Sequence, residues 1–560
     1  MSMKRWRIAK QTASTKRLSE DLGISEVISQ LLVNRGIKDV GDAYEFLYPQ
    51  RRFLYSPFLL PDLEKATERL RKAIDRRERI LLFGDYDVDG LTSLAMLSDY
   101  LSKREALFKV MIPSRIEEGY GFNEKALTFA KKEGISLIIS LDCGSNCPLL
   151  NQAVSLNKDV IVIDHHELNP MERSFLLINP KRKDISYPFR DISSGVLTFK
   201  FIWALKGLFP YEYLDLVALS IVCDVMPLID ENRILLKEGL EKLRLSPCLG
   251  VQTLIEETSL KKEFIDTFHL GWILGPRLNA SGRVSSAYSS FSLLRADSPS
   301  KALELVSLLE ENNQQRKLET EAILNSALSQ LKDKDLTKEF VIVLADETWH
   351  IGVLGIAASR LKDMFVRPVF LFSLDKDTAR GSARSIESFN LIEALEACRD
   401  FVKEFGGHRK ACGLEIEKKK LSGFKSAINN YAKKVLREED LIGRLFIDKE
   451  ISFSQIDKSL LEYLKLFPPY GEANPQPLFI SRGVSVKNIT TSRDNGKKII
   501  WFEQREKGKD WVFPAQVSLN NKVFQLIEYT NIFDIVYSLR EDASSIAPVV
   551  LKLQDIRISS

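Results

Sequence analysis

Acidic residues and a pair of histidines follow short apolar runs at several points of the sequence. The apolar runs are "ILLF" (80–83), "LIISL" (137–141) and "VIVI" (160–163). The residues that follow them are Asp85, Asp87 and Asp89, then Asp142, then Asp164, His165 and His166. Asp224 comes after a further apolar segment, "LVALSIVC". The whole chain has only five histidines, so an adjacent pair among these acids indicates a shared chemical role.

This mixture of carboxylates and imidazoles suits a divalent metal ion. Carboxylates that cluster without a cation would repel one another at a considerable cost in free energy. Oxygen and nitrogen ligands without thiolates favour Mn²⁺ or Mg²⁺ over Zn²⁺. The stretch "DYDVDG" resembles the start of a calcium loop but lacks the later oxygen ligands and the closing glutamate. Because the ligands outnumber those that one ion needs, we expect a two-metal centre that can hydrolyse a phosphoester.

A parallel β-sheet is the element that would bring these residues together. The apolar runs have the length of buried strands, and helical patterns such as residues 91–103 alternate with them, which predicts an α/β domain. In such sheets, functional groups collect in the loops beyond the carboxyl ends of the strands. We therefore expect four strand ends, including one before Asp224, to meet at one edge of the sheet.

The remaining sequence changes texture several times. Short helical patterns with a proline-rich interruption come first, a long polar helical stretch follows the first α/β unit, and a second α/β unit comes next. Alternating, β-rich sequence with turn signals ends the chain and is typical of a small barrel. The expected domains are an N-terminal helical segment (1–75), a first lobe with the metal site (76–299), a connector helix (300–335), a second lobe (336–437) and a barrel (438–560).

Composition sets the broad class of the protein. A chain of 560 residues with 44% apolar and 28% charged residues is typical of a folded protein of several domains. The formal charge of +4 is nearly neutral, so a surface that binds nucleic acid would have to be local. We find no signal peptide and no membrane-spanning run, and the six cysteines form no pair of CxxC motifs. These features predict a protein of the reducing cytoplasm without a membrane partner.

Further segments extend the acidic motifs into a family pattern. They are "PSRIEEGYG" (113–121), "GPRLNASGR" (275–283), "WHIGVLGIAASRL" (349–361), "GSARS" (381–385), "GGHRKACG" (406–413) and "PPYGEANPQPLF" (468–479). Over almost the whole chain, and in order, the set closely resembles the RecJ-type exonucleases of the DHH phosphoesterase superfamily. The resemblance implies a DHH domain, a DHH-associated domain and a C-terminal OB-fold. It also implies that the protein hydrolyses single-stranded DNA from a 5′ end, releases mononucleotides, uses two Mn²⁺ or Mg²⁺ ions, and acts in DNA recombination and repair.

The resemblance assigns a role to each residue of the predicted metal centre. Asp87 and Asp142 would hold one metal, and Asp89, Asp142, His165 and Asp224 would hold the other, with Asp142 as the bridge. Asp85 would lie beside the first metal and His166 would contact the scissile phosphate or the leaving oxygen. Asp164 would orient an imidazole, as metal-bound histidines usually require. Some superfamily members have a metal-binding histidine where this chain has Phe83, so the first metal site is expected to have one fewer nitrogen ligand.

Other motifs would hold the DNA strand. "GPRLNASGR" offers Arg277, Asn279 and Arg283 in a predicted loop, and Arg115 is a further candidate. "GSARS" offers Ser382 and Arg384 on a predicted tight turn suited to a terminal 5′-phosphate. His408 and His350 would face the metal lobe from the second lobe, whereas His269 is expected to be structural. Ala383 and Ala473 stand where the family usually has glycine, and either would be strained at a positive φ.

The C-terminal segment interleaves aromatic and basic residues, as an OB-fold that grips single strands would. The candidate stacking residues are Trp501, Phe502, Trp511 and Phe513, and the candidate basic residues are Arg493, Lys497, Lys498, Arg505, Lys507 and Lys509. Some of these aromatic side chains could instead face a barrel core.

Three functions remain open from the sequence. The first is the exonuclease acting as a monomer on single-stranded DNA, with a helicase and a single-strand-binding protein as candidate partners. The second is a catalytically inactive relative that scaffolds a replication complex, although a scaffold has no need of the acidic cluster. The third is an enzyme for pyrophosphate, cyclic dinucleotides or short oligoribonucleotides. Such enzymes need only the two lobes, so the additional segments favour a longer polymer.

Overall fold

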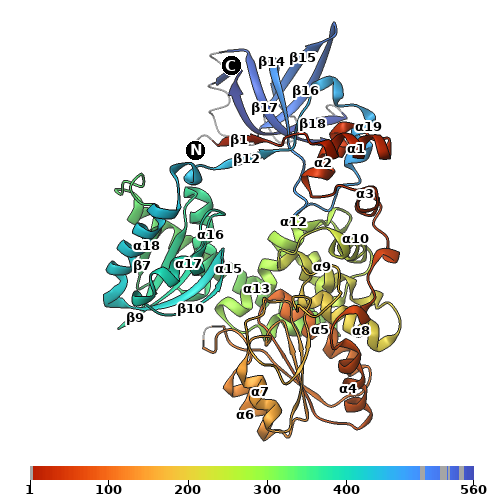
Figure 1. The fold of residues 1–560 in the computed structure, drawn as a ribbon, viewed down its shortest axis with the longest axis vertical. Coiled ribbons are helices and arrows are strands. Elements are labelled where there is room, and N and C mark those ends of the chain that lie inside the picture. The colour runs from red at the N-terminus through yellow and green to blue at the C-terminus, as the bar shows by residue number, and fades with distance from the viewer. Residues whose placement is uncertain are drawn as a thin grey trace.

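The computed structural model describes residues 4–115, 117–491, 498–517, 526–527, 530–541 and 548–559. Two α/β lobes, joined by one long helix, and a C-terminal β-barrel make up the molecule (Figure 1). This arrangement confirms the predicted fold class. None of the helices in the described ranges is both long and apolar enough to span a membrane.

A parallel five-stranded sheet is the centre of the first lobe. Its order is β3 (Phe108–Met111), β2 (Ile80–Gly84), β4 (Leu137–Leu141), β5 (Asp159–Ile163), β6 (Leu176–Ile178). Because side chains alternate between the two faces of a strand, this sheet contributes to two cores. The smaller core lies under α6 (Glu124–Lys132) and α7 (Pro148–Ser155). The larger core lies under α4 (Leu63–Asp75), α5 (Val88–Ser102), α8 (Ser194–Lys206), α9 (Leu214–Cys223), α10 (Asp230–Leu245), α11 (Leu249–Glu257), α13 (Gly275–Val284) and α14 (Tyr288–Leu294).

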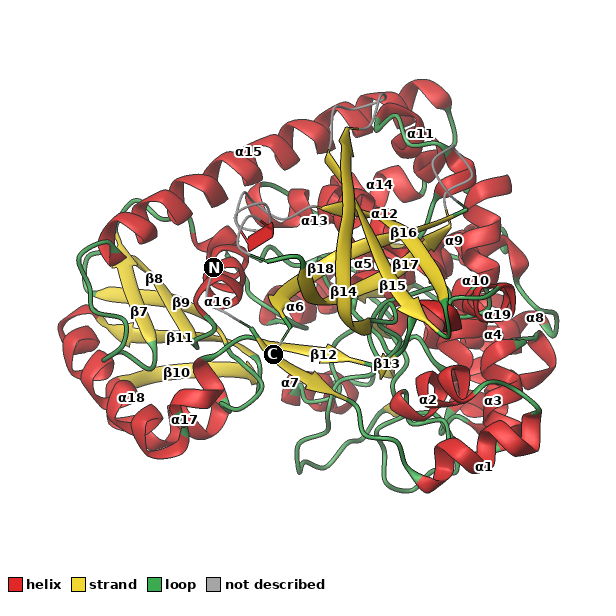
Figure 2. Ribbon diagram, turned by 90° about the horizontal axis from the view of Figure 1, so that it is seen from above, coloured by secondary structure: helices red, strands yellow, loops and turns green. Residues whose placement is uncertain are grey.

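A single helix of 33 residues, α15 (Pro299–Leu331), connects the first lobe to the second (Figure 2). The second sheet has the order β10 (Val402–His408), β11 (Ala411–Glu417), β9 (Thr378–Arg384), β8 (Val369–Leu374), β7 (Ile342–Asp346). Only β7 and β8 are parallel. The helices of this lobe are α16 (Leu354–Phe365), α17 (Leu391–Ala397) and α18 (Leu421–Val435).

The C-terminal strands close into a barrel because β14 pairs with both β15 and β17. The strands are β13 (Lys449–Glu450), β14 (Phe479–Thr491), β15 (Lys498–Glu506), β16 (Lys509–Val517), β17 (Ile532–Glu541) and β18 (Val549–Ile558), and α19 (Lys458–Leu464) precedes β14. Phe502 is buried in the barrel core, and Trp511 and Phe513 pack against it. Trp501 is half-buried and donates a hydrogen bond to Thr490. Phe502 is therefore a core residue, and Arg493 and Lys497 fall outside the described ranges.

The N-terminal segment packs against the far end of the chain. Its helices α1 (Ala13–Leu22), α2 (Glu26–Asn34) and α3 (Val40–Leu47) share one hydrophobic core with the barrel. A strand that the sequence did not predict, β1 (Arg5–Ile8), pairs in parallel with β12 (Arg444–Ile447). The buried guanidinium of Arg233 on α10 donates to the backbone carbonyls of Phe46, Leu466 and Phe467. These contacts fix the barrel to the first lobe.

Three local predictions were wrong. Asp224 follows the helix α9 instead of a strand. The prediction failed because α9 is buried almost all round, so that its apolar run lacks the periodicity of an amphipathic helix. "GPRLNASGR" is the helix α13 instead of a loop, with its proline in the first turn, where proline is tolerated. "GSARS" includes the end of strand β9 instead of forming a tight turn. Ala383 accordingly has no positive φ, whereas Ala473 has a φ of 58° and takes the strained conformation expected of it.

Candidate metal centre

The carboxyl edge of the first sheet collects the predicted acids. Asp85 and Asp142 directly follow β2 and β4. Asp87 caps the N-terminus of α5, where its carboxylate accepts from the backbone N–H groups of Asp89 (3.0 Å) and Gly90 (3.2 Å). A parallel sheet with helices after its strands therefore places these side chains at one edge, as the sequence predicted.

Asp89 is held by groups that the sequence did not identify. Its two carboxylate oxygens accept from the backbone N–H groups of Ser194 and Gly195, each at 2.8 Å, at the N-terminus of α8. The hydroxyl of Ser220 donates to the same carboxylate at 2.5 Å. Position 195 must be glycine, because a Cβ there would clash with the hydroxyl of Ser220. These three donors fix the orientation of the Asp89 side chain at the N-terminus of α8.

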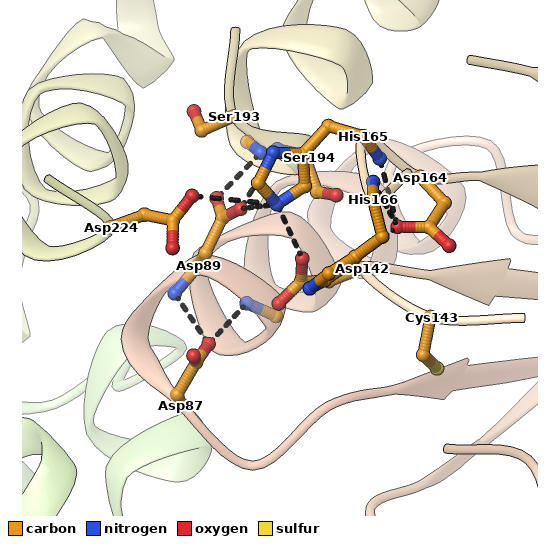
Figure 3. Close-up of polar contacts among 12 residues, drawn as sticks. Asp87, Asp89, Asp142, Cys143, Asp164, His165, His166, Ser193, Ser194 and Asp224 are labelled. Atoms are coloured by element: carbon orange, nitrogen blue, oxygen red, sulfur yellow. Dashed lines mark hydrogen bonds and ion pairs between the residues drawn. The ribbon is translucent and has the colours of Figure 1, made fainter. Parts of the chain in front are cut away.

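His165 lies at the centre of the cluster (Figure 3). Its Nε2 is 3.4 Å from a carboxylate oxygen of Asp142, 3.4 Å from one of Asp224 and 3.7 Å from one of Asp89. This Nε2 and buried oxygens of Asp85, Asp142 and Asp224 have no hydrogen-bond partner. Buried polar atoms normally have partners, so four that converge without one indicate that a cation belongs among them.

The electrostatics of the cluster also favour a cation. Burial, reinforced by the neighbouring carboxylates, raises the pKa of Asp85, Asp142 and Asp224 well above its usual value. Burial lowers the pKa of His165, which keeps a neutral nitrogen lone pair available as a ligand. Two sets of side chains are close enough to hold an ion each, namely Asp89, His165 and Asp224, and Asp85, Asp87 and Asp142. His166 also lies within reach of Asp142 and His165.

His166 differs from its neighbour in its partners. Its Nδ1 lies 2.7 Å from a carboxylate oxygen of Asp164 and 3.2 Å from the hydroxyl of Tyr120. Burial opposes a charge on His166, but the hydrogen bond and charge of Asp164 outweigh burial and raise its pKa to about 9. From His165, Asp164 receives only the backbone N–H, so the imidazole that it orients is that of His166. The ring of His166 also stacks with that of His408 across the two lobes, at 6.2 Å between centroids.

Arginines from both lobes gather beside the carboxylates. Burial first, and then the charges of Arg115 and Arg384, lower the pKa of Arg283 to about 9. Arg384 is half-buried, burial also lowers its pKa, and its guanidinium donates to the hydroxyl of Ser382 at 3.2 Å. Arg115 lies over the ring of Tyr86, 5.2 Å from its centroid. Guanidinium groups that repel one another in a buried place form a ready site for a phosphate.

Four other predicted residues have partners within the protein. Arg277 forms an ion pair with Glu310 of α15 at 2.6 Å, and the Asn279 side chain accepts from the backbone N–H of Val88 at 3.1 Å. His350 accepts from the backbone N–H of Gly352. His269 pairs with Asp266, as its expected structural role requires. Phe83 is buried in the smaller core of the first lobe, so no nitrogen ligand comes from that position.

Comparison with known proteins identifies the lobes. The DHH family N-terminal domain matches residues 79–221, the DHHA1 domain matches 338–434 and the RecJ OB domain matches 447–543. These matches account for the predicted DHH domain, DHH-associated domain and OB-fold.

Curated relatives and solved structures agree with these matches. The single-stranded-DNA-specific exonuclease RecJ of Bacillus subtilis is 35% identical over 493 residues, which cover 87% of this chain but only 63% of the longer relative. RecJ of Haemophilus influenzae is 32% identical and aligns with 76% of this chain and 78% of its own length. The crystal structure of RecJ in complex with Mn²⁺ from Thermus thermophilus superimposes with a TM-score of 0.83 at 26% identity, over 99% of this chain and 80% of that one. The Mg²⁺ complex of the same protein gives a TM-score of 0.76.

The Mn²⁺ and Mg²⁺ of these two structures are the ions that carboxylate and imidazole ligands favour. The acidic and histidine groups of this chain are positioned to hold such ions. The chain therefore belongs to the RecJ family of DHH proteins.

Proposed function

We propose that this protein is a metal-dependent exonuclease that degrades single-stranded DNA from the 5′ end and releases mononucleotides. The observation that carries the proposal is the joint position of two groups of side chains. Unpartnered carboxylate and imidazole atoms form a metal centre, and arginines of both lobes form a phosphate site beside it. A strand whose terminal phosphate occupied the arginine site would present its first phosphodiester to the metal centre.

Five residues would hold the two ions. Asp89, His165, Asp142 and Asp224 would hold one, and Asp87 and Asp142 would hold the other, with Asp85 beside it. This assignment is supported by the two ligand sets at the sheet edge and by the position of Asp142 next to both. Bound Mn²⁺ or Mg²⁺ would neutralise charge on the scissile phosphate and supply an activated water.

His166 would handle the proton of the leaving group. Because its pKa is raised to about 9, the imidazole carries a proton at neutral pH. Asp164 occupies Nδ1, which leaves Nε2 as the donor to the scissile phosphate or leaving oxygen. Asp164 thus acts as a positioning residue, and the hydroxyl of Tyr120 lies 3.2 Å from the same Nδ1.

Arg115, Arg283, Ser382 and Arg384 would bind the 5′-phosphate, and His408 would face the scissile nucleotide from the second lobe. Their support is the arginine cluster and the stacking of His408 on His166. A phosphate held by several guanidiniums is positioned as well as bound. Arg277 and Asn279, which are engaged within the protein, would act on DNA only indirectly, through α13 and α5.

Two other functions fit less well. A catalytically inactive scaffold would have no use for four buried atoms that lack partners. An enzyme for cyclic dinucleotides or short oligoribonucleotides would need no barrel, whereas here the barrel and the N-terminal helices share a core and are joined to the first lobe. We further infer that the protein works in the cytoplasm, because its six cysteines are free thiols. A role in DNA recombination and repair follows from its membership of the RecJ family. A monomer that receives substrate from a helicase and a single-strand-binding protein is the simplest arrangement.

The test is an assay of end-labelled DNA with Mn²⁺. We expect 5′-phosphorylated single strands to be degraded to mononucleotides, and blunt duplex, a cyclic dinucleotide and 5′-blocked strands to persist. Protection by a 3′ block instead would contradict the polarity. Arg384→Ala should raise the KM for 5′-phosphorylated strands by roughly tenfold or more, as loss of a charge-assisted contact does. An equal loss on 5′-hydroxyl strands would argue against the phosphate site.

A further inference from the structure

Three large aromatic side chains of the first lobe are exposed close to one another in the chain. Phe264, Phe268 and Trp272 have exposed fractions of 64%, 57% and 75%. Single exposed apolar residues need no explanation, but grouped aromatic residues mark binding surfaces. Tryptophan in particular offers a rigid, flat contact area at low entropic cost. Nothing in the proposed chemistry of the metal centre uses these residues.

Phe268 and Trp272 lie on one helical run, whereas Phe264 ends the short 3-10 turn before it. The short helix α12 (Thr267–His269) continues into a π-helical turn, Leu270–Leu274, and then into α13. The inner side of this run packs closely on α9, since a Cβ at Gly275 would come within 2.5 Å of the sulfur of Cys223. Leu270 and Leu274 are the fully buried side chains of the π-helical turn and pack into the core of the first lobe. Trp272 is therefore not required for this packing, and π-turns are frequent at functional sites.

The run leads from the phosphate site towards the barrel. At one end α13 carries Arg283, about 16 Å from Trp272 along the helix at about 1.5 Å per residue. At the other end the hydroxyl of Thr267 donates to the carbonyl of Tyr470 at 2.6 Å, in the segment before the barrel. Figures 1 and 2 place α12 and α13 on the side of the first lobe that lies beneath the barrel.

We propose that Trp272 and Phe268 form a stacking platform for the bases of the single strand between the metal centre and the barrel. The inference rests on the proposed function and adds a contact for the strand to it. Residues four apart lie on one side of a helix, so the two rings can receive neighbouring bases. At about 3.4 Å for each stacked nucleotide, the platform lies about five nucleotides from the 5′-phosphate. Stacking is independent of sequence but requires free base faces, which a duplex does not offer.

Substrate length tests the platform directly. The steady-state KM would be measured for a 5′-phosphorylated trinucleotide and for a strand of about 20 nucleotides. We expect Trp272→Ala to raise the KM of the long strand about tenfold, since base–aromatic stacking is a substantial contact. The trinucleotide is too short to reach the platform and should keep its KM. Trp272→Phe should restore most of the affinity, and Phe268→Ala should act like Trp272→Ala but more weakly.

A matched control and a second readout make the result decisive. Leu208→Ala removes a side chain of similar exposure, 71%, in the turn after α8, and should change neither KM. A long-strand KM that Trp272→Ala leaves unchanged, or an equal rise for both substrates, would overturn the platform. Quenching of tryptophan fluorescence by single-stranded DNA in EDTA should be weaker in Trp272→Phe than in the wild type and should report the stacking without turnover. Quenching without any DNA hydrolysis by the wild type would keep the platform and reject the proposed function.

Discussion

Two clusters of buried charge in the first lobe differ in whether their polar atoms have partners inside the protein. In one of them, the ammonium group of Lys200 lies 2.7 Å from a carboxylate oxygen of Glu231 and donates to the carbonyl of Tyr55 at 2.9 Å. Glu231 also accepts from the backbone N–H of Tyr55, at 2.7 Å, and from the hydroxyl of Tyr187. Both charged groups therefore have hydrogen-bond partners, although both side chains are shielded from solvent.

The metal centre is also largely buried, but it is left open. Asp85, Asp142 and Asp224 each have a buried carboxylate oxygen without a hydrogen-bond partner. The Nε2 atom of His165 has none either. A closed cluster such as that of Lys200 and Glu231 holds the fold together, because its charges compensate one another. An open cluster costs stability until a cation from outside completes it. The two clusters should therefore respond in opposite ways when a member is neutralised.

Neutralising Asp142 should have the largest effect on activity. Asp142→Asn removes the charge next to both ligand sets, and a loss of about 4 kcal/mol of transition-state stabilisation would lower kcat/KM by roughly a thousandfold or more. The same change relieves repulsion among Asp142, Asp89 and Asp224, so the metal-free protein should be at least as stable as the wild type. Both outcomes are checked by DNA hydrolysis and by thermal unfolding in EDTA. A metal-free variant that unfolds more easily would mean that this cluster is closed as well.

Neutralising Lys200 should have the opposite pattern. Lys200→Met leaves Glu231 charged and buried without compensation, which should lower the free energy of unfolding by about 3–5 kcal/mol. The double variant Lys200→Met, Glu231→Gln should recover part of this loss, because the uncompensated charge is gone. Chemical denaturation of the two variants measures the difference. If Lys200→Met were as stable as the wild type, the pair would not hold the fold.

The sequence predicted the elements that carry their own pattern. The runs of β2, β4 and β5 are apolar and short, and each is followed at once by acid, so the sheet edge and its ligands were recognisable. Asp224 was recognised as an acid that follows an apolar run, but α9 could not be distinguished from a strand, because a helix buried almost all round loses its amphipathic period.

Other features depend on contacts between distant parts of the chain. Asp89 is held by backbone N–H groups at positions 194 and 195, and a backbone group leaves no sequence signal that points to its distant partner. Arg277 and Arg384 are equivalent as arginines in a motif, and only the tertiary structure pairs Arg277 with Glu310 and leaves Arg384 in the arginine cluster. The pairing of β1 with β12 joins residues over 400 positions apart, and the sequence of neither strand predicts its partner.

Replacing His166 should have an intermediate effect that separates it from His165. His166→Gln removes a general acid and should lower kcat about a hundredfold. Its raised pKa, about 9, means that the charged form and its ion pair with Asp164 are fully present below the ordinary histidine value and are lost as pH rises through about 9. Wild-type kcat should therefore fall above that pH, and the variant should lack this alkaline decline. His165→Gln should instead remove Mn²⁺ binding at the site of Asp89, His165 and Asp224 in calorimetry, whereas His166→Gln should retain both sites.

The smallest effect is expected at an ion pair that is closed but near the surface. Arg277 and Glu310 lie 2.6 Å apart, and Glu310 is nearly half exposed, so solvent screens the attraction. Glu310→Gln should lower the free energy of unfolding by only about 0.5 kcal/mol or less. If Arg277 acts only through α13, its release should leave the KM for 5′-phosphorylated DNA unchanged. A lower KM would mean that the freed guanidinium of Arg277 binds the 5′-phosphate together with Arg283. Glu310 would then be the residue that keeps Arg277 away from the DNA in the wild type.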